Sequence, residues 1–276
     1  MKEREFLLKK MSKFFAAFLA AAMALTMLAG CNDNPPASDA SGSGDAEKTK
    51  FVLGLDDSFP PMGYRDDNDE IVGFDIDLAQ AVCDELGMEL VLQPIAWESK
   101  EMELNNGNID CIWNGLSVDA ERQEKMNLSK PYMENHMVVV VNKGSDIESR
   151  KDLIGKNVGV QKGSTALKAA NNDEFISQSN LVEYDTNVLA LTDLPTGRID
   201  AIVLDEVVAN YSIKEDQDKY VVLDDFLSAE EYAIAFKKGN DDLKAKVEGA
   251  IDKLIENGKA AEISNKWFGK DVLLKD

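Results

Sequence analysis

Short apolar runs alternate with amphipathic segments along most of this chain, and the alternation predicts its secondary structure. Apolar runs of strand length that are bounded by turn residues indicate buried strands. They occur at residues 51–55, 71–72, 88–93, 109–113, 137–141, 158–160, 181–184, 199–204, 221–223 and 232–236. Segments with a helical pattern lie between or after them, at residues 73–86, 97–107, 166–171, 188–194, 206–212 and 241–267. Strands that alternate with helices predict an α/β fold whose parallel sheet is covered on both faces.

The alternating pattern occurs in two units, and the second is inserted between the first unit and a C-terminal helical region. We therefore expect two lobes, one formed by residues 51–140 and 236–276 and the other by residues 141–235. The chain would cross between the lobes twice, and two crossover strands would form a hinge. A cleft between two lobes is a preferred place for a small-molecule site.

The first 30 residues indicate an export signal. Basic residues precede a nearly all-apolar run at residues 14–28, which is short for a membrane span of about 20 residues. The run is followed by Leu-Ala-Gly-Cys31, which resembles a bacterial lipobox and implies cleavage before Cys31 and its lipidation. Residues 31–50 are rich in Asp, Ser, Gly and Ala, which predicts a flexible tether. The pattern leaves open whether Met1 or Met11 is the start.

The charge and the cysteine content exclude several classes of partner. The net charge of −21 argues against binding to nucleic acid and against adsorption on anionic lipid. The chain has three cysteines without a CxxC motif and one histidine, His136, so we expect no metal and no cofactor. Cys83 and Cys111 are interpreted as buried thiols, although the sequence does not decide whether they pair.

One segment combines the features of a binding site. An apolar run leads into Asn114, Gly115 and Ser117, which predict a turn just beyond a strand. A helix then begins near Asp119 and carries Arg122 in its first turn. Ligands of open α/β sheets bind beyond the carboxyl ends of strands, and a guanidinium matches the geometry of a carboxylate. The alternative is a surface arginine on a solvated helix.

Several motifs of residues 51–268 occur in one order. They are FPPMGYRDDNDEIVGFDIDLAQAV, an isolated Trp97, NIDCIWNGLSVDAERQEKMNLSKPY, VGVQKGST and GRIDAIVLDEVVAN. In this order they resemble the polar amino acid-binding proteins of bacterial ABC importers, over about residues 51–268. The resemblance implies a two-lobed, periplasmic-binding-protein-like fold of type II with two crossover hinge strands.

The resemblance also implies which residues bind the ligand. They are Asp56, Phe59, Trp97, Asn114, Gly115, Ser117, Arg122, Ser164, Thr165 and Asp205. By this resemblance Arg122 holds the α-carboxylate with help from Ser117 and Thr165, while Asp205 and a carbonyl near Gly115 hold the α-ammonium. The aromatic residues flank the ligand side chain, and Asp56 contacts its distal polar group. The family often has Ser or Thr at positions 114 and 115, so any contact at Gly115 would be made by backbone.

Some of these residues have structural alternatives. Asp205 is placed to cap the following helix, and Asp56 to form a turn. Phe59 and Trp97 would also suit a hydrophobic core. The position of Asp75 at a helix start is explained by the helix dipole alone.

The resemblance predicts an extracytoplasmic receptor, held at the membrane by a lipid anchor only, that delivers a free L-amino acid to an ABC permease. We expect a monomer without enzymatic activity. Asp56 favours a basic or amide side chain on the ligand, and an acidic ligand is disfavoured because Arg122 is the one basic residue among the implied ligand-binding residues. Two alternatives remain, a cystine-binding protein and an enzyme on the same fold that resembles cyclohexadienyl or arogenate dehydratase. Such an enzyme would need a general acid or base in the cleft.

Overall fold

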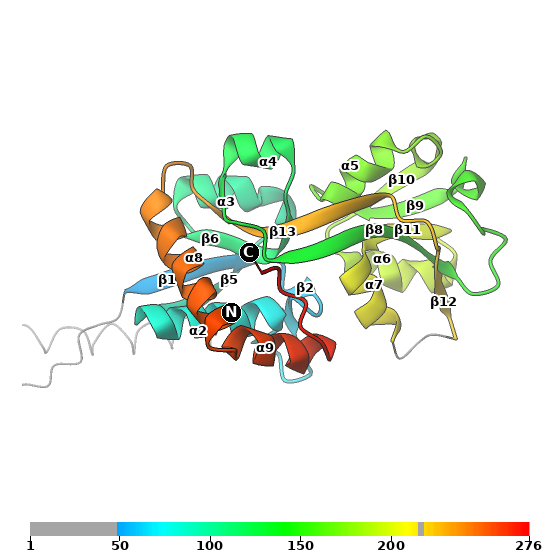
Figure 1. Ribbon diagram of the computed structural model, residues 1–276. Helices are drawn as coiled ribbons and strands as arrows, with labels where there is room; N and C mark the ends of the chain where they lie inside the picture. The colour runs from blue at the N-terminus through cyan, green and yellow to red at the C-terminus, as the bar shows by residue number, and fades with distance from the viewer. Residues whose placement is uncertain (1–48, 215–217, 276) are drawn as a thin grey trace, which may run out of the picture. The chain divides into compact units, whose positions relative to one another are not determined.

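The computed structural model describes residues 49–214 and 218–275 (Figure 1). The described residues within 47–276 pack as one compact unit, and we call residues 47–276 the body. The predicted export signal, the predicted lipidation site Cys31 and most of the predicted tether lie outside the described residues. Within the described part of the chain, no helix has the length and apolar character that crossing a membrane requires.

A ten-stranded sheet runs through the body in the order β10-β9-β11-β8-β13-β6-β1-β5, with β12 beside β8 and β7 beside β13. A second, three-stranded sheet contains β2, β3 and β4. The strands are β1 (Lys50–Leu55), β2 (Ser58–Phe59), β3 (Gly63–Arg65), β4 (Ile71–Val72), β5 (Glu89–Pro94), β6 (Cys111–Ser117), β7 (Asn127–Leu128), β8 (Met133–Asn142), β9 (Asn157–Gln161), β10 (Asn180–Tyr184), β11 (Ala201–Asp205), β12 (Tyr220–Val222) and β13 (Ser228–Phe236).

The helices follow the predicted order. They are α2 (Phe74–Leu86), α3 (Lys100–Asn106), α4 (Ala120–Lys125), α5 (Thr165–Asn172), α6 (Asn187–Asp193), α7 (Glu206–Ile213), α8 (Asp241–Glu256) and α9 (Lys259–Phe268). A 3-10 turn at Trp97–Ser99 leads into α3, so helical structure begins at Trp97 as predicted.

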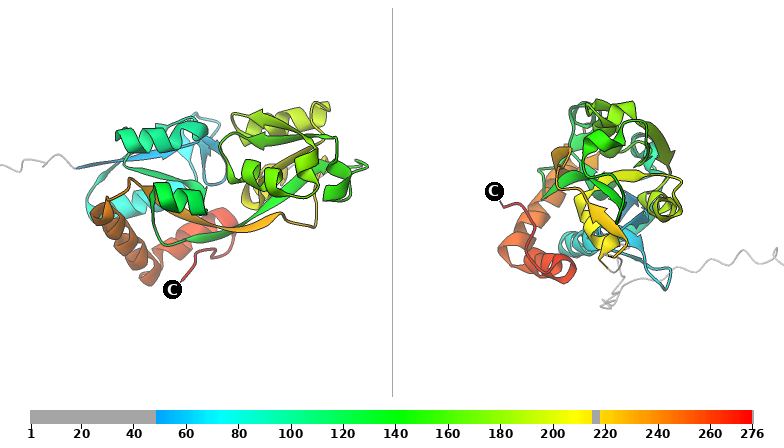
Figure 2. Two further views of the ribbon diagram at one scale, coloured as in Figure 1. Left: turned by 90° about the horizontal axis from the view of Figure 1, so that it is seen from above. Right: turned by 90° about the vertical axis from the view of Figure 1, so that its right-hand side faces the viewer.

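Each half of the large sheet has a set of strands that pair in parallel. Two long strands, which pair antiparallel with their neighbours, join the two halves. Strand β1 pairs in parallel with β5 and β6, and β9 pairs in parallel with β10 and β11. Residues 133–137 of β8 pair with β13, and residues 137–141 pair with β11. Strand β13 continues from β8 to β6, and both long strands run between the halves (Figures 1 and 2). The predicted two-lobed fold with two crossover strands is thereby confirmed.

We call the half that contains β1, β5 and β6 lobe 1, and the half that contains β9, β10 and β11 lobe 2. The residue boundaries of the lobes stay a prediction. In lobe 1 the helices α2, α8 and α9 pack on one another and contribute to the largest hydrophobic cluster. Trp97 and Leu104 belong to a separate cluster with Ile112 of β6. In lobe 2, α5 packs with one cluster while α6 and α7 contribute to another, so the sheet is covered on both faces.

Strand β6 differs from the prediction. Asn114, Gly115 and Ser117 do not form a turn beyond the strand, because β6 continues to Ser117 and is buried throughout. The pairing of β6 with β13 shifts register between Ala233 and Ala235, and Gly115 has a φ of 57°. This is a β-bulge, which uses the residue types of a turn inside a strand. The sequence pattern therefore predicted a break where the chain only bends.

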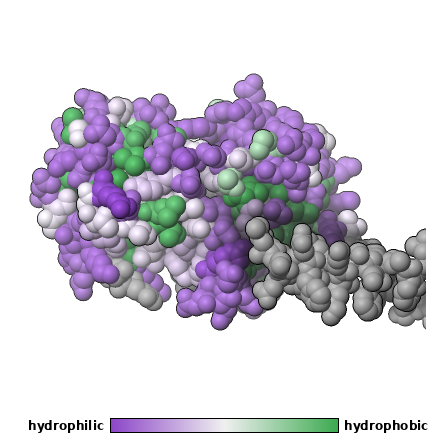
Figure 3. All heavy atoms as spheres, turned by 180° about the vertical axis from the view of Figure 1, so that it is seen from behind, coloured by the Kyte–Doolittle hydropathy of each residue, from purple (hydrophilic) through white to green (hydrophobic). Residues whose placement is uncertain are grey.

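The cysteines and the surface agree with the sequence. Cys83 and Cys111 are free and fully buried, as small hydrophobic residues would be, and burial raises the pKa of the Cys83 thiol to about 11. On the face in Figure 3, hydrophilic residues predominate and hydrophobic residues gather in separate patches.

Candidate functional site

The bulge in β6 places two predicted site residues against other elements of lobe 1. The Asn114 side-chain carbonyl accepts a hydrogen bond from the backbone N–H of Asp56 at 3.1 Å. The Gly115 N–H donates to the Asp75 carboxyl at 2.8 Å. A Cβ atom at position 115 would lie 2.8 Å from Phe59, so close packing and the positive φ both favour glycine there.

Asp75 has a role that its position in the sequence did not reveal. It lies in the first turn of α2 as predicted, but it is fully buried and accepts hydrogen bonds from the Tyr132 hydroxyl and from Gly115 N–H. Burial raises the pKa of Asp75 to about 7. The helix dipole alone is therefore an incomplete explanation, because this carboxyl also supports the bulge.

Helix α4 brings Arg122 to the end of β6. Asp119 caps the helix, since its carboxylate accepts from the Arg122 N–H at 2.7 Å. The Arg122 side chain is only 2% exposed, and Nη1 donates to the Ser117 carbonyl at 2.6 Å. Burial lowers the pKa of Arg122 from its ordinary value. The structure therefore contradicts the alternative of an arginine on a solvated surface.

Lobe 2 supplies the start of α5 opposite Ser117. The Ser164 hydroxyl caps the helix by accepting from the Leu167 N–H at 3.1 Å. Thr165 Oγ1 lies 3.2 Å from Ser117 Oγ and 2.9 Å from a Glu230 carboxylate oxygen. The carboxylate only accepts, so the Thr165 hydroxyl donates to Glu230 and accepts from Ser117. Hydroxyl groups from both lobes thus meet close to Arg122.

Asp205 is the last residue of β11 and is buried. Its carboxylate accepts from the Tyr232 hydroxyl at 2.7 Å and from the Asn135 amide at 2.8 Å. Burial raises the pKa of Asp205 to about 7. Asp205 holds the N-cap position of α7, but its side chain makes no capping hydrogen bond. The structure therefore contradicts the alternative of a capping role, and the carboxylate faces the two crossover strands.

Asp56 is held at the other end of the predicted site. One carboxylate oxygen accepts from the Ser58 N–H at 2.9 Å, and the other accepts from Gln161 Nε2 of lobe 2 at 2.7 Å. Burial raises the pKa of Asp56 to about 6. Gln161 in turn lies 3.4 Å from the Asn187 amide. A buried polar chain therefore crosses from lobe 1 to lobe 2 at this end.

The two aromatic residues of the prediction are buried. Phe59 is 6% exposed and packs against Gly115, while Trp97 is 7% exposed and packs with Leu104 and its neighbours. Lys100 lies with its ammonium 4.8 Å from the centre of the Trp97 ring. The burial is compatible both with a core role and with a role as the wall of a ligand site.

Two grooves border this group of residues. One has a volume of about 600 Å³ and is lined by Asp119, Thr165, Lys168 and Glu230 among others. The other, of about 410 Å³, includes Asn135 and Glu230. Both grooves therefore reach Glu230, at the edge of the predicted site.

Sequence reasoning missed several polar residues that complete the site. They are Asp75, Lys100, Asn135, Gln161, Asn187, Glu230 and Tyr232. Glu230 and Tyr232 are two residues apart on β13 and thus point to the same face, and Glu230 pairs in register with Asn135. This alternation was the available signal, but only the apolar end of β13 was recognised. His136 is half-exposed, and its ring Nδ1 lies 2.8 Å from a Glu206 carboxylate oxygen.

No group of three or more His, Cys, Asp or Glu side chains in the described parts of the chain is placed to hold a metal ion. The site offers a buried guanidinium, the carboxylates of Asp56, Asp75, Asp205 and Glu230, and several hydroxyl and amide groups from both lobes. Such a set suits a small zwitterion with a further polar group.

Known proteins resemble this chain over most of its length. The L-cystine-binding protein TcyJ of Escherichia coli is 31% identical over 256 residues, covering 91% of this chain and 94% of TcyJ. A crystal structure of an ABC uptake transporter substrate-binding protein from Streptococcus pneumoniae with bound histidine is 39% identical with a TM-score of 0.79, covering 82% of this chain and 95% of that one.

The arginine-, lysine-, histidine-binding protein ArtJ from Geobacillus stearothermophilus is 36% identical with a TM-score of 0.75, covering 81% of this chain and 96% of ArtJ. These relatives are named as binding proteins, so they favour binding over the dehydratase alternative. The sequence model of one protein family, the bacterial extracellular solute-binding proteins, family 3, matches residues 51–270 of this chain. This chain belongs to the bacterial extracellular solute-binding proteins, family 3.

Proposed function

We propose that this protein is the extracytoplasmic receptor of an amino acid ABC importer and that it binds a polar L-amino acid between its lobes. Arg122 holds the α-carboxylate, with the hydroxyl groups of Ser117 and Thr165 beside it. Asp205 holds the α-ammonium. The ligand therefore touches both lobes and stabilises the conformation in which they are together.

The observation that carries the proposal is the opposition of two charges. Arg122 comes from α4 of lobe 1 and is 2% exposed, while Asp205 comes from β11 of lobe 2 and is 5% exposed. The ion pair of Arg122 with Asp119 is long, at 3.9 Å, and the Asp205 carboxylate accepts from the uncharged Tyr232 hydroxyl and Asn135 amide. A buried charge that is only weakly paired costs free energy, so each of these groups favours an opposite charge on a ligand. An α-amino acid carries both charges, on an ammonium and a carboxylate group attached to the same carbon atom.

Asp56 favours a basic side chain over an amide. Its two oxygens accept from a backbone N–H and from a neutral amide, and no cation forms an ion pair with it in residues 49–214 and 218–275. An ammonium or guanidinium at the end of the ligand side chain would supply the missing positive charge. Gln161 and Asn187 would offer further hydrogen bonds there.

The remaining expectations belong to this proposal. A lipid on Cys31 anchors the chain, residues 31–50 act as the tether, and the receptor docks on its permease as a monomer. Residues 51–140 with 236–276 form lobe 1, and residues 141–235 form lobe 2. None of the groups described above is assigned a catalytic role.

Isothermal titration calorimetry on residues 47–276 tests the proposal directly. The panel contains the twenty L-amino acids, ornithine and cystine, with arogenate and prephenate added in a separate turnover assay. We expect arginine, lysine or ornithine to bind more tightly than glutamine, and glutamate not to bind. Absence of binding to every compound in the panel, or turnover of arogenate or prephenate, contradicts the proposal.

A further inference from the structure

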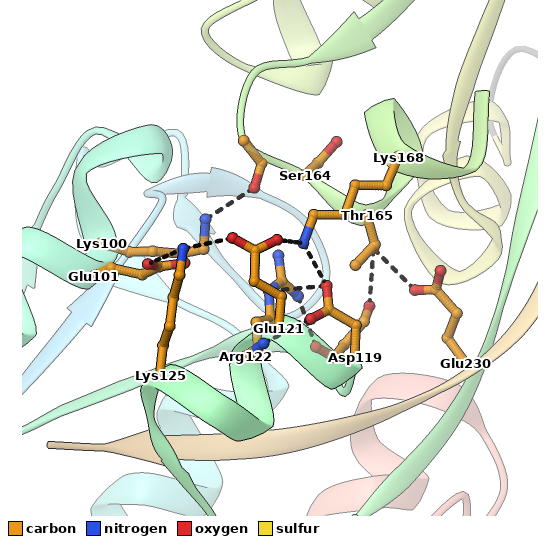
Figure 4. A network of polar contacts seen from close by, with 12 residues as sticks. Lys100, Glu101, Asp119, Glu121, Arg122, Lys125, Ser164, Thr165, Lys168 and Glu230 are labelled. Carbon is orange, nitrogen blue, oxygen red and sulfur yellow. Dashed lines mark hydrogen bonds and ion pairs between the residues drawn. The ribbon is translucent and has the colours of Figure 1, made fainter. Parts of the chain in front are cut away.

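A network of charged side chains spans the cleft beside the predicted carboxylate site (Figure 4). Lys168 on α5 of lobe 2 reaches two acids on lobe 1. Its ammonium lies 2.7 Å from an Asp119 oxygen and 2.6 Å from a Glu121 oxygen. Both acids lie at the start of α4, the helix that carries Arg122. The network thus joins α5 to the element that positions Arg122.

The lobe 1 side of this network is held in place by further ion pairs. Glu121 also pairs with Lys125 of the same helix, and Lys125 lies 3.2 Å from Glu101 of α3. These contacts stay within lobe 1, so movement of the lobes leaves them intact. The contacts of Lys168, in contrast, need both lobes to be together.

Asp119 connects this network to Arg122. One of its oxygens accepts from the Arg122 N–H, and the other lies 2.7 Å from Lys168 Nζ and 3.9 Å from Arg122 Nε. The same carboxylate oxygen therefore faces two cations. Without Lys168, the charge of Asp119 would act on the buried guanidinium alone and would compete with a ligand carboxylate for it.

An exposed ion pair usually contributes little to folding, because water and salt screen it. Lys168 is 43% exposed and Glu121 is 49% exposed, so a large effect on the unfolding free energy is not expected. The ion pairs of Lys168 lie between the lobes, so they affect the equilibrium between open and closed conformations more than the stability of the fold. Their whole contribution falls on the conformation in which the lobes are together and therefore shifts a conformational equilibrium.

We propose that Lys168 is an interlobe latch that also positions the charge around Arg122. When the lobes meet, Lys168 ties α5 to Asp119 and Glu121, and its pairing with Asp119 leaves Arg122 available to the ligand carboxylate. The first part of this inference concerns the protein without any ligand. The second part rests on the function proposed above.

The first part is tested by the distance between the lobes. Spin labels are attached in residues 47–276 at Met102→Cys on α3 and Ile154→Cys in lobe 2, which are 56% and 50% exposed, whereas Cys83 and Cys111 are buried. With no amino acid present, we expect Lys168→Met to lower the ratio of short to long distances by about two- to tenfold. About 0.5 M NaCl should act in the same direction on the unsubstituted protein.

Two variants serve as controls for this measurement. Lys168→Arg keeps the charge and should restore the short distance. Lys253→Met removes a 2.7 Å ion pair with Glu85 that lies within lobe 1, and it should leave the distances unchanged. Equal distance distributions for Lys168→Met and the unsubstituted protein would overturn the latch, whatever the outcome of any ligand titration.

The second part is tested by L-arginine titrations of Lys168→Met and of Lys168→Met with Asp119→Asn. Asparagine still caps a helix, so the double variant removes the charge of Asp119 while keeping α4. We expect Lys168→Met to weaken binding by about threefold to tenfold and the added Asp119→Asn to recover part of that loss. Binding by the double variant that is equal to or weaker than that of Lys168→Met would overturn the coupling to Arg122.

Discussion

The two ends of the predicted site differ in the charge of the groups that face each other across the lobes. At the end that contains Arg122, Thr165 and Asp205, buried groups of opposite charge come from the two lobes. At the end that contains Asp56, the carboxylate is joined to lobe 2 by the neutral amide of Gln161. In the proposed function the first end binds the groups that all α-amino acids share, and the second binds only the distal part of a side chain. The difference implies that general recognition and selectivity can be changed separately.

The largest effect is expected at the first end. Replacing Arg122 by alanine removes a charge-assisted pair with the ligand carboxylate, which should cost about 2–5 kcal/mol of binding free energy, or at least about thirtyfold in affinity. Calorimetry with the tightest-binding amino acid measures this loss. Arg198→Ala, on an exposed arginine of lobe 2, is the control and should bind normally. Full affinity in Arg122→Ala would contradict the assignment of the carboxylate.

Support of the bulge by Asp75 should appear in folding stability. Asp75→Ala leaves the Tyr132 hydroxyl and the Gly115 N–H without their buried partner, so the free energy of unfolding should fall by about 2–4 kcal/mol. Urea denaturation measures the change. Asp84→Ala, at an exposed position of the same helix, should change stability by less than about 0.5 kcal/mol. Equal stabilities for the two variants would argue against this role of Asp75.

The second end should control selectivity. Asp56→Asn removes the buried charge that favours a cationic side chain, which should weaken arginine binding by about tenfold to a hundredfold and change glutamine binding little. The ratio of the two dissociation constants is the measured quantity. Asp57→Asn is the matched control, because Asp57 pairs with Arg65 at the surface instead. An equal loss of affinity for arginine and for glutamine would contradict this role, because it would mean that Asp56 contacts a group that both ligands share.

The pH dependence of ligand binding is the smallest expected effect. Burial raises the pKa of Asp205 to about 7 and that of Asp56 to about 6. A cationic ligand group favours the ionised carboxylates, so binding is strongest above both pKa values and weakens as the pH falls through them. Between pH 7.5 and 6.0 the arginine affinity should fall by roughly tenfold. The fall should be smaller in Asp56→Asn, and a rise in affinity over this range would contradict the assignment of both acids.

Much of the fold could be predicted because apolar patterns report burial directly. The runs that became β1, β9 and β11 were recognised within one or two residues, since strands buried on both faces are continuously apolar. The pattern was wrong at Asn114, Gly115 and Ser117, since a bulge inside a strand uses the same residue types as a turn. Local composition does not distinguish a bend that keeps its pairing from one that ends it.

Only part of the site could be predicted from the sequence. Arg122, Thr165 and Asp205 follow strand ends or helix starts, where the sequence pattern marks them. Gln161 and Asn135 lie within or beside apolar strands, and their partners Asp56 and Asp205 are 105 and 70 residues away in the chain. Such contacts depend on tertiary pairing, which a single sequence does not encode in a local pattern. The selectivity of the site is therefore harder to predict than its general chemistry.

A crystal structure of residues 47–276 with L-arginine tests the central claim most directly. We predict that the ligand carboxylate lies within hydrogen-bond distance of Arg122 and Thr165, that its α-ammonium contacts Asp205, and that its guanidinium faces Asp56 and Gln161. A ligand bound in the opposite direction, with its carboxylate beside Asp56, or bound outside the cleft between the lobes, would contradict the account.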